Sequence, residues 1–368
     1  MKTNLLKFVP NLFVIWLLAI ALQACDNGPD PVIPVGTDGF YIVNEGAYNG
    51  SNASISFYDR NSDKVINDLF AAKNGRPLGD QAQSIAFHEQ KAYVVLQNSA
   101  KIEVIDASDY SSLQTISTGL ESPRYFLVID NNKAYVTDWG LDGITGTVKV
   151  IDLNAGTVTK TISTGQGANK MIKGFGNDTG VVFVANSGGY GKDNKITIID
   201  SNSDAIVGTI AVGDNPNSLK FDDNGNLWVA SSGMLAYKED FSIDEVNSTK
   251  PTLSKINPDR TEVLRLEFPD VSYLGATIES SPIGDQLYIN YDGAVYKMAS
   301  SATTLPTTPF VDKMFYGIGM DTFTQQLIGC EAPTFSSPGK IYFYDDKGTL
   351  LKSMEVGIAP NGITVKGF

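Results

Sequence analysis

The stretch "KITIIDSNSDAIVGTIAVGDNP" at residues 195–216 decides the fold, because the chain contains several versions of it. Earlier versions are "TVKVIDLNAGTVTKTISTGQGA" at 147–168 and "KIEVIDASDYSSLQTISTGLESP" at 101–123. Each version holds an alternating apolar segment that ends in Asp, then a polar turn, a second alternating segment and a glycine loop. Apolar residues that alternate with a period of two indicate half-buried strands. The repeated unit is therefore made of strands.

The aspartate that closes the first segment of each version defines the period of the repeat. It falls at Asp59, Asp106, Asp152 and Asp200, at intervals of 47, 46 and 48 residues, and less regular later copies place Asn257, Lys297 and Asp345 there. An Asp side chain can accept a hydrogen bond from the backbone N–H two residues later and so fix a turn. We predict this turn role for the aspartates and assign them no chemistry.

Each unit reads as four strands. Between Gly119 and Gly165 the chain reads "RYFLVID", "AYVTDW", "TVKVID" and "VTKTIST", without a helical period. Four-stranded units of 40–50 residues are typical of propeller blades, which bury their faces by packing on neighbours. Residues 39–368 divide into seven units of about 47 residues. We predict an all-β, seven-bladed β-propeller with four antiparallel strands per blade, while the irregular later units leave six or eight blades open.

The two ends of the repeat indicate how the ring closes. "GIAPNGITVKGF" at 357–368 opens like a new unit and then stops, whereas "GFYIVNEGAYNG" at 39–50 starts without such an opening. We predict that the C-terminal strand completes blade 1, which leaves no free sheet edge.

The first 38 residues have a different composition. Residues 1–25 combine a lysine-containing start, the apolar run "FVPNLFVIWLLAIA" and "LQAC", which resembles a lipobox ending at Cys25. We predict a lipoprotein signal peptide over 1–25, a lipid attached to Cys25 and a flexible tether over 26–38, so that the protein is anchored at the outer-membrane surface. The alternative is a plain secretory signal in which Cys25 is incidental.

Charge and residue counts exclude several kinds of function. The formal net charge of −13 opposes binding to nucleic acid. The single histidine, His88, lies in the short hairpin "FHEQK", away from the long loops, so neither a Ser-His-Asp arrangement nor a His-rich zinc site is available there. Cys330 is expected to be a buried small hydrophobic residue. We therefore predict no enzyme activity, no catalytic cofactor and no metal site.

The long loops of the repeat meet on one face of the predicted propeller, and they hold the candidate ligand-binding residues. These are Tyr48, Gln83, Arg124, Asp138, Trp139, Asn169, Tyr190, Asn217, Tyr237, Tyr273, Tyr316 and Phe335, with Tyr291 as a further aromatic residue of this face. Aromatic rings among neutral hydrogen-bonding groups suit a large, uncharged ligand rich in amides or hydroxyls. Trp139 and Tyr190 lie in neighbouring loops and are expected to contact the same ligand, although about half of the rings should pack between blades.

The units at 91–119, 133–165 and 181–216 resemble the blades of YncE-like, surface-layer-type seven-bladed propellers. The likeness is clear over blades 2 to 5 and weak over blades 6 and 7. Together with the lipobox, it resembles the BtuG family of Bacteroides surface lipoproteins. That resemblance implies capture of cobalamin and related corrinoids and their transfer to a TonB-dependent transporter of the BtuB type. The amide-rich edge of a corrin would suit the Asn and Gln residues, and its flat faces would suit Trp139 and the tyrosines.

Other functions remain open because a fold does not determine a function. One alternative is a propeller that binds a glycan or another small ligand with the same aromatic face. Another is a structural or adhesive surface protein. A lactonase- or lyase-type propeller is a third, although it normally needs a metal ion or a histidine on its working face.

Overall fold

The computed structural model of the chain describes residues 38–366. The predicted signal peptide with Cys25, and the tether up to residue 37, lie outside the described residues. Within 38–366, no helix has both the length and the apolar character needed to cross a membrane.

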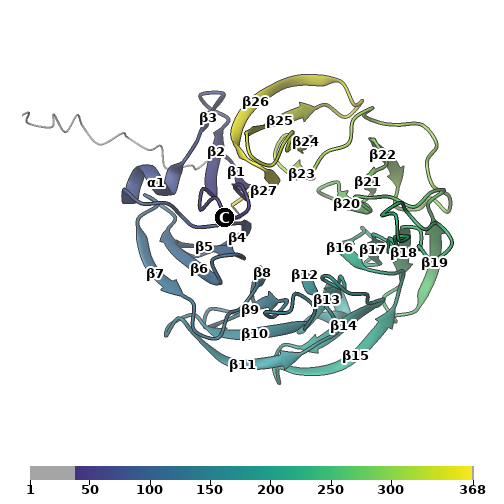
Figure 1. The fold of residues 1–368 in the computed structure, drawn as a ribbon, viewed down its shortest axis with the longest axis horizontal. Coiled ribbons are helices and arrows are strands. Elements are labelled where there is room, and N and C mark those ends of the chain that lie inside the picture. The colour runs from purple at the N-terminus through teal and green to yellow at the C-terminus, as the bar shows by residue number, and fades with distance from the viewer. Residues whose placement is uncertain (1–37, 367–368) are drawn as a thin grey trace, which may run out of the picture. The chain divides into compact units, whose positions relative to one another are not determined.

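Seven antiparallel sheets surround a central axis in the described part of the chain, which confirms the seven-bladed β-propeller (Figure 1). Blade 1 holds β1 (Gly39–Asn44), β2 (Ser54–Asp59), β3 (Lys64–Ile66) and β27 (Pro360–Thr364). Blade 2 holds β4 (Ala82–His88), β5 (Lys91–Leu96), β6 (Lys101–Asp106) and β7 (Ser112–Ile116). Blade 3 holds β8 (Pro123–Val128), β9 (Lys133–Asp138), β10 (Thr147–Asp152) and β11 (Thr157–Ser163).

The remaining blades continue the same order along the chain. Blade 4 holds β12 (Ala168–Lys173), β13 (Val181–Asn186), β14 (Lys195–Asp200) and β15 (Ala205–Ala211). Blade 5 holds β16 (Pro216–Phe221), β17 (Leu227–Ser231), β18 (Thr252–Ile256) and β19 (Glu262–Glu267). Blade 6 holds β20 (Ala276–Ser280), β21 (Gln286–Tyr291) and β22 (Ala294–Ala299), and blade 7 holds β23 (Gly317–Asp321), β24 (Gln326–Glu331), β25 (Pro338–Tyr344) and β26 (Leu350–Ile358).

The apolar core lies between adjacent blades. In β14, Ile196 and Ile198 pack against blade 5, while Ile199 packs against blade 3. Successive side chains of a strand point to opposite faces of the sheet, so a strand with a neighbour on both sides reads as a nearly continuous apolar run. This explains the segment "ITII" and its counterparts in the other units.

The aspartates of the repeat fix turns, as predicted. Asp106 accepts a hydrogen bond from the backbone N–H of Ser108 at 2.7 Å, and Asp200 accepts one from that of Asn202 at 3.0 Å. Asp59, Asp152 and Asp345 accept from the residue two positions later in the same way.

The ring closes as predicted, because β27 pairs with β1 and forms the innermost strand of blade 1. An ion-pair cluster reinforces this closure. Arg60 Nη1 lies 2.6 Å from Asp38, and Arg60 Nε lies 3.0 Å from the buried carboxylate of Asp321 in blade 7. The two ends of the described chain are therefore joined by the pairing of β27 with β1 and by the ion pairs of Arg60.

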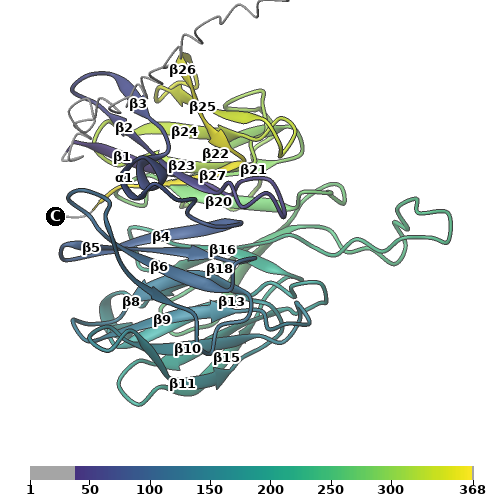
Figure 2. The same ribbon diagram turned by 60° about the vertical axis from the view of Figure 1, so that its left-hand side comes forward.

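Three features differ from a ring of identical blades. Blade 6 has three strands instead of four. In place of a fourth, outer strand, the chain makes a single β-bridge, between Val295 and Val311. The segment before Val311 contains Pro306 and Pro309, which cannot donate to a ladder. A short helix that the repeat does not predict, α1 (Leu69–Asn74), lies between blades 1 and 2. The insertion at 232–251 forms a hairpin that projects from the ring, drawn in green at the right of Figure 2.

Candidate functional site at the channel mouth

The seven inner strands begin at one end of the ring and build a cavity there. The second residues of these strands are Gln83, Arg124, Asn169, Asn217, Thr277, Ile318 and Asn361, and all seven line a cavity of about 320 Å³. We call this cavity the channel mouth. Because the residues occupy equivalent positions of the repeat, the fold itself brings together six polar side chains from six different blades.

Irregular strand pairing aims several of these side chains at the mouth. The pairing of the inner strand with the next strand shifts register between Ala82 and Ser84 in blade 2, and between Pro216 and Ser218 in blade 5. Blades 3 and 4 shift at the corresponding place. A β-bulge turns a side chain away from the regular alternation. The second residue of the strand thereby faces the axis.

A second cavity, of about 380 Å³, continues the channel mouth along the axis. The two cavities share Gln83, Tyr125, Lys170, Ile318 and Asn361. Deeper in the channel, Lys220 forms an ion pair with Glu279. The mouth is therefore the entrance of a longer polar channel.

Glu45, from the loop between β1 and β2, is a buried acid at the mouth. Its side chain accepts hydrogen bonds from the Tyr316 hydroxyl and from Asn361 Nδ2, each at 3.0 Å. The residue is only 7% exposed and has no ion pair within residues 38–366. Burial raises the pKa of the Glu45 carboxyl above its ordinary value, while the bond from Asn361 and the charge of Arg124 oppose this shift.

Arg124 connects the mouth to the aromatic residues of the surrounding loops, Trp139 and Tyr190. We call these loops the rim. Its guanidinium carbon lies 4.0 Å from the centre of the Trp139 ring, and the guanidinium donates a hydrogen bond to Gln97. Trp139 in turn meets Tyr190 edge to face, with ring centres 5.9 Å apart. The predicted proximity of Trp139 and Tyr190 is thus found, and Arg124 covers one face of the Trp139 ring.

Three polar atoms of the mouth are buried and have no hydrogen-bond partner in the described chain. They are Arg124 Nε, Asn169 Oδ1 and Thr277 Oγ1. A buried polar group without a partner costs about 1–3 kcal/mol, so such groups are rare. Three of the twelve such atoms in the described chain line this one cavity, where a bound molecule would complete their hydrogen bonding.

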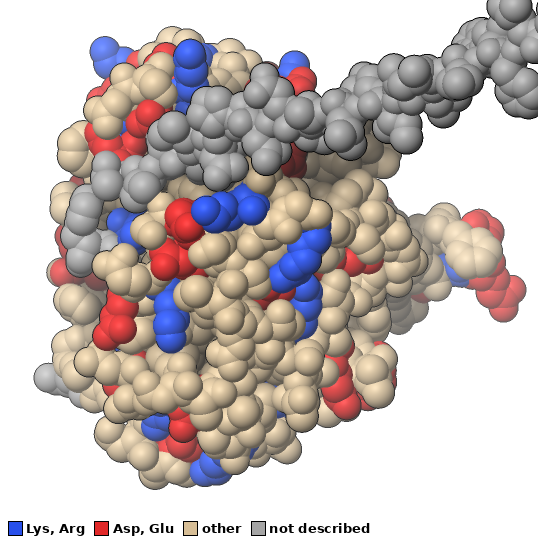
Figure 3. Space-filling view, turned by 90° about the vertical axis from the view of Figure 1, so that its left-hand side faces the viewer, with Lys and Arg blue, Asp and Glu red and all other residues tan. Residues whose placement is uncertain are grey.

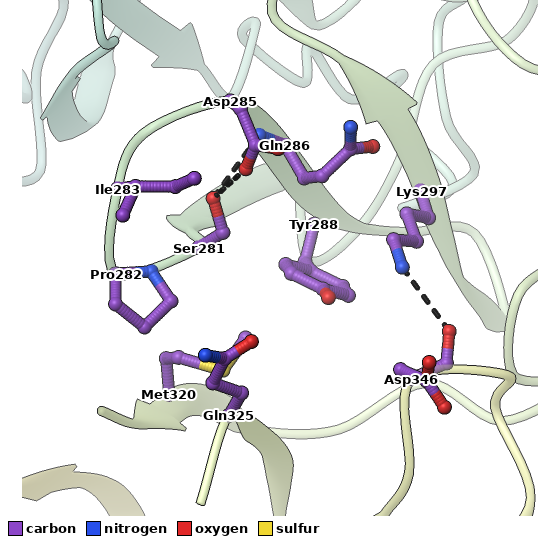
Figure 4. A pocket seen from close by; sticks show the side chains of 10 residues that line it. All are labelled: Ser281, Pro282, Ile283, Asp285, Gln286, Tyr288, Lys297, Met320, Gln325 and Asp346. Carbon is purple, nitrogen blue, oxygen red and sulfur yellow. Dashed lines mark hydrogen bonds between the residues drawn. The ribbon is translucent and has the colours of Figure 1, made fainter. Parts of the chain in front are cut away.

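A cavity of similar size between blades 6 and 7, on the far face, lacks this feature (Figure 4). There Ser281 donates to Asp285 at 2.6 Å, and Lys297 donates to the backbone oxygen of Asp346 at 3.1 Å. Among the described residues, no unpartnered buried polar atom lines this far-face cavity between blades 6 and 7. The channel mouth is therefore the stronger candidate for a ligand site.

Comparison with protein families places the chain in a group. The model of a domain of unknown function, DUF5074, matches residues 38–358, which is nearly all of the described part. The chain belongs to the DUF5074 family.

Solved structures share the fold of this DUF5074 domain. A "putative 6-phosphogluconolactonase" from Bacteroides fragilis is 15% identical over 89% of this chain and 98% of its own, with a TM-score of 0.63. A "Quinonprotein alcohol dehydrogenase-like protein" from Bacteroides thetaiotaomicron is 16% identical over 89% of this chain and 78% of its own, with a TM-score of 0.61. Likeness at this identity concerns the fold alone. No match was found among curated proteins.

Eleven of the thirteen predicted site residues of the DUF5074 domain fall into three groups. Five of them line the mouth, namely Gln83, Arg124, Asn169, Asn217 and Tyr316. Four lie around the mouth without lining it: Trp139 contacts Arg124, Phe335 contacts Tyr316, Tyr273 precedes Leu274 in the chain, and Tyr190 is one contact further out, on Trp139. Tyr48 and Tyr237 are exposed on loops and line neither channel cavity.

Asp138 and Tyr291, also named from the sequence, are buried, line neither channel cavity and make their hydrogen bonds within the protein. Asp138 is fully buried, and its carboxylate accepts hydrogen bonds from the backbone N–H groups of Glu121, Ser122 and Gly140 at 2.8 to 3.0 Å. It therefore orders two rim loops. Tyr291 packs in blade 6 and donates to the backbone oxygen of Asp270 at 2.9 Å.

Sequence reasoning missed Glu45, Lys170, Thr277 and Asn361 at the mouth of this domain. Thr277 and Asn361 hold the second position of their strands, so the register of the repeat would have identified them. Glu45 has no local signal, because its partners come from blade 7 and from the closing strand.

Other predictions concern the far face and the blade interior. His88 ends β4, at the opposite end of that strand from Gln83, as predicted. Cys330 is buried and free, and burial raises the pKa of its thiol to about 12. Residues 38–366 contain no group of three His, Cys, Asp or Glu side chains placed to hold a metal ion.

Proposed function

We propose that this DUF5074 protein captures a corrinoid at the channel mouth and releases it unchanged. The observation that carries this proposal is the ring of hydrogen-bonding residues at the mouth, five of which are neutral, with exposed aromatic rings nearby. Asn169, Asn217 and Gln83 each offer both a donor and an acceptor, as do the amide side chains at the edge of a corrin.

The dimensions of the mouth support binding at its rim. A corrin macrocycle is larger than a cavity of about 320 Å³, so amide side chains would enter while the ring lies across the entrance. Tyr190 and Tyr273, on loops around the entrance, are 79% and 78% exposed and supply flat apolar surface for the ring of the ligand.

The residues of the mouth favour binding over catalysis. His88 lies at the far end of its strand, and Glu45 is the one carboxylate among the lining residues of the mouth. Acyl or lactone hydrolysis needs a nucleophile with an oriented base beside it. We therefore propose no enzyme activity and no catalytic cofactor, although a fold neighbour carries the description of a lactonase.

The cellular part of the proposal rests on the lipobox and on the resemblance to surface lipoproteins. A lipid on Cys25 would hold the propeller at the outer-membrane surface, where it would pass the corrinoid to a TonB-dependent transporter. Nucleic acid is not proposed as a partner. The net charge is −13, and the side of the ring in Figure 3 carries acidic and basic residues intermixed, without a continuous basic surface.

Calorimetry with cyanocobalamin on residues 35–368, which form one compact unit, tests the proposal. We expect saturable binding that Asn169→Ala weakens by about 1–3 kcal/mol, since the ligand loses a hydrogen bond in a desolvated site. Asn202→Ala, in a far-face turn, is the matched control and should change nothing. The absence of binding by the parent overturns corrinoid capture. Binding of maltohexaose instead would favour glycan capture, and hydrolysis of 6-phosphogluconolactone would contradict a purely binding role.

A further inference from the structure

Beside the acceptor Asn169 Oδ1, two buried atoms of the channel mouth that can donate a hydrogen bond lack a partner in the described chain. Arg124 Nε and the Thr277 hydroxyl are buried and unpartnered in the described chain, and both residues line the mouth. Lys170 lines the mouth and the deeper channel as well. These three donors come from blades 3, 4 and 6, so the closed ring brings them to one cavity.

Lys170 differs from the other lysines of its surroundings. Its ammonium group lies 5.8 Å from the centre of the Tyr125 ring and makes neither an ion pair nor a hydrogen bond with residues 38–366. Lys173, three residues later on β12, donates to the backbone oxygen of Ile129 at 2.8 Å. Lys220 is paired with Glu279. Lys170 is thus a cation of the channel wall without an anionic partner among residues 38–366.

The charge of the wall is opposite to that of the whole chain. The lining residues of the two cavities include the cations Arg124, Lys170 and Lys220 but only the acids Glu45 and Glu279, in a protein with a net charge of −13. Glu279 is neutralised by Lys220, and both oxygens of Glu45 are engaged by Tyr316 and Asn361. Charges in a concave, partly desolvated site attract counter-charges more strongly than surface charges do.

We propose that the channel mouth binds an anionic group of its ligand, a phosphate or a carboxylate, between Lys170 and Arg124, with the Thr277 hydroxyl as a third donor. Phosphate and carboxylate oxygens accept several charge-assisted hydrogen bonds at once, which matches this set of donors. The inference rests on the proposed function in one respect, because it takes the mouth to be a ligand site. It adds an anionic anchor to a ligand that is otherwise neutral.

Titration of residues 35–368 with inorganic phosphate and, separately, with acetate tests this anchor at constant ionic strength. Calorimetry is performed on the parent, on Lys170→Gln and on Lys173→Gln, which removes the same charge from the same strand outside the two cavities. We expect at least one anion to bind the parent, Lys170→Gln to weaken it about tenfold or more, and Lys173→Gln to change it less than twofold. Unchanged melting temperatures establish that both variants fold.

The results separate this inference from the proposed function. Failure of both anions to bind, equal affinity in Lys170→Gln, or an equal loss in Lys173→Gln each overturns the anionic anchor. Anion binding that depends on Lys170, together with no binding of cyanocobalamin, supports the anchor and rejects the corrinoid. Binding of cyanocobalamin without any anion binding supports the corrinoid and rejects the anchor.

Discussion

The hydroxyl of Tyr316 donates a hydrogen bond of 3.0 Å to the carboxylate of Glu45, across the junction where blade 7 meets blade 1. The other oxygen of Glu45 accepts from Asn361, which belongs to the closing strand β27. The candidate site and the closure of the ring therefore share residues, and the arrangement at the mouth exists only when the ring is closed.

Glu45→Gln should change how stability depends on pH. Burial raises the pKa of the Glu45 carboxyl in the folded protein, so the folded state holds this proton more tightly than the unfolded chain does. The contribution of Glu45 to stability is present at low pH and declines as pH rises above the ordinary glutamate value. Urea unfolding between about pH 4.5 and pH 7.5 should show that the parent loses stability relative to Glu45→Gln over this range.

Glu121→Gln serves as the control for that comparison, because Glu121 is an exposed carboxylate of a rim loop. Its pH profile should follow that of the parent. If the stability of Glu45→Gln followed the same pH profile as that of the parent, the folded protein would bind the Glu45 proton no more tightly than the unfolded chain does.

Deletion of residues 359–368 should destabilise the whole ring. The deletion removes β27, so it takes the inner strand from blade 1, exposes the edge of β1 and leaves Glu45 without Asn361. We expect a loss of several kcal/mol out of the 5–15 kcal/mol typical of a folded domain. Urea unfolding followed by circular dichroism measures it. Deletion of 366–368 keeps β27 and also Val365, which packs against the core between blades 7 and 1, so it should unfold like the parent. Equal midpoints for both deletions would contradict closure by this strand.

The period of the aspartates favoured seven blades, and their place after each strand predicted the turn chemistry, because both depend on local spacing. The incomplete first and last units of the repeat predicted the closing strand. The positions of Asn169 and Asn217 at the mouth were also predictable, since the repeat sets their register. The burial of Asp138 was not predictable, because a carboxylate in a loop can face a ligand or the backbone N–H groups of a neighbouring loop. Glu45 escaped prediction because its partners lie far away along the chain.

Cys330 should be inert in the folded protein. Its side chain is fully buried between blades 7 and 1, and burial raises the pKa of the thiol to about 12, so the thiolate is scarce at neutral pH. Residues 35–368, which lack Cys25, should react with a thiol reagent at pH 8 only after urea is added. Rapid labelling of the native protein would mean that this seam opens without global unfolding.

Gly143→Ala should displace Tyr190 from the rim of the mouth. Gly143 has φ +69°, and a Cβ there would lie 2.3 Å from the Tyr190 ring. The substitution thus adds a clash with a movable ring to the backbone strain of a left-handed residue, which costs about 1 kcal/mol. Gly75→Ala has a similar φ of +63° with nothing within 4 Å of the new Cβ, so it isolates the backbone term.

Gly143→Ala should lose at least as much stability as Gly75→Ala, and only Gly143→Ala should disturb the contact of Tyr190 with Trp139. The two tryptophans of residues 35–368 are Trp139 and the fully buried Trp228, so a change in near-ultraviolet circular dichroism reports mainly on the rim. We expect that change in Gly143→Ala together with faster release of cyanocobalamin, and neither effect in Gly75→Ala. An altered spectrum with an unchanged release rate would remove Tyr190 from the binding site while leaving the packing of the two loops as described.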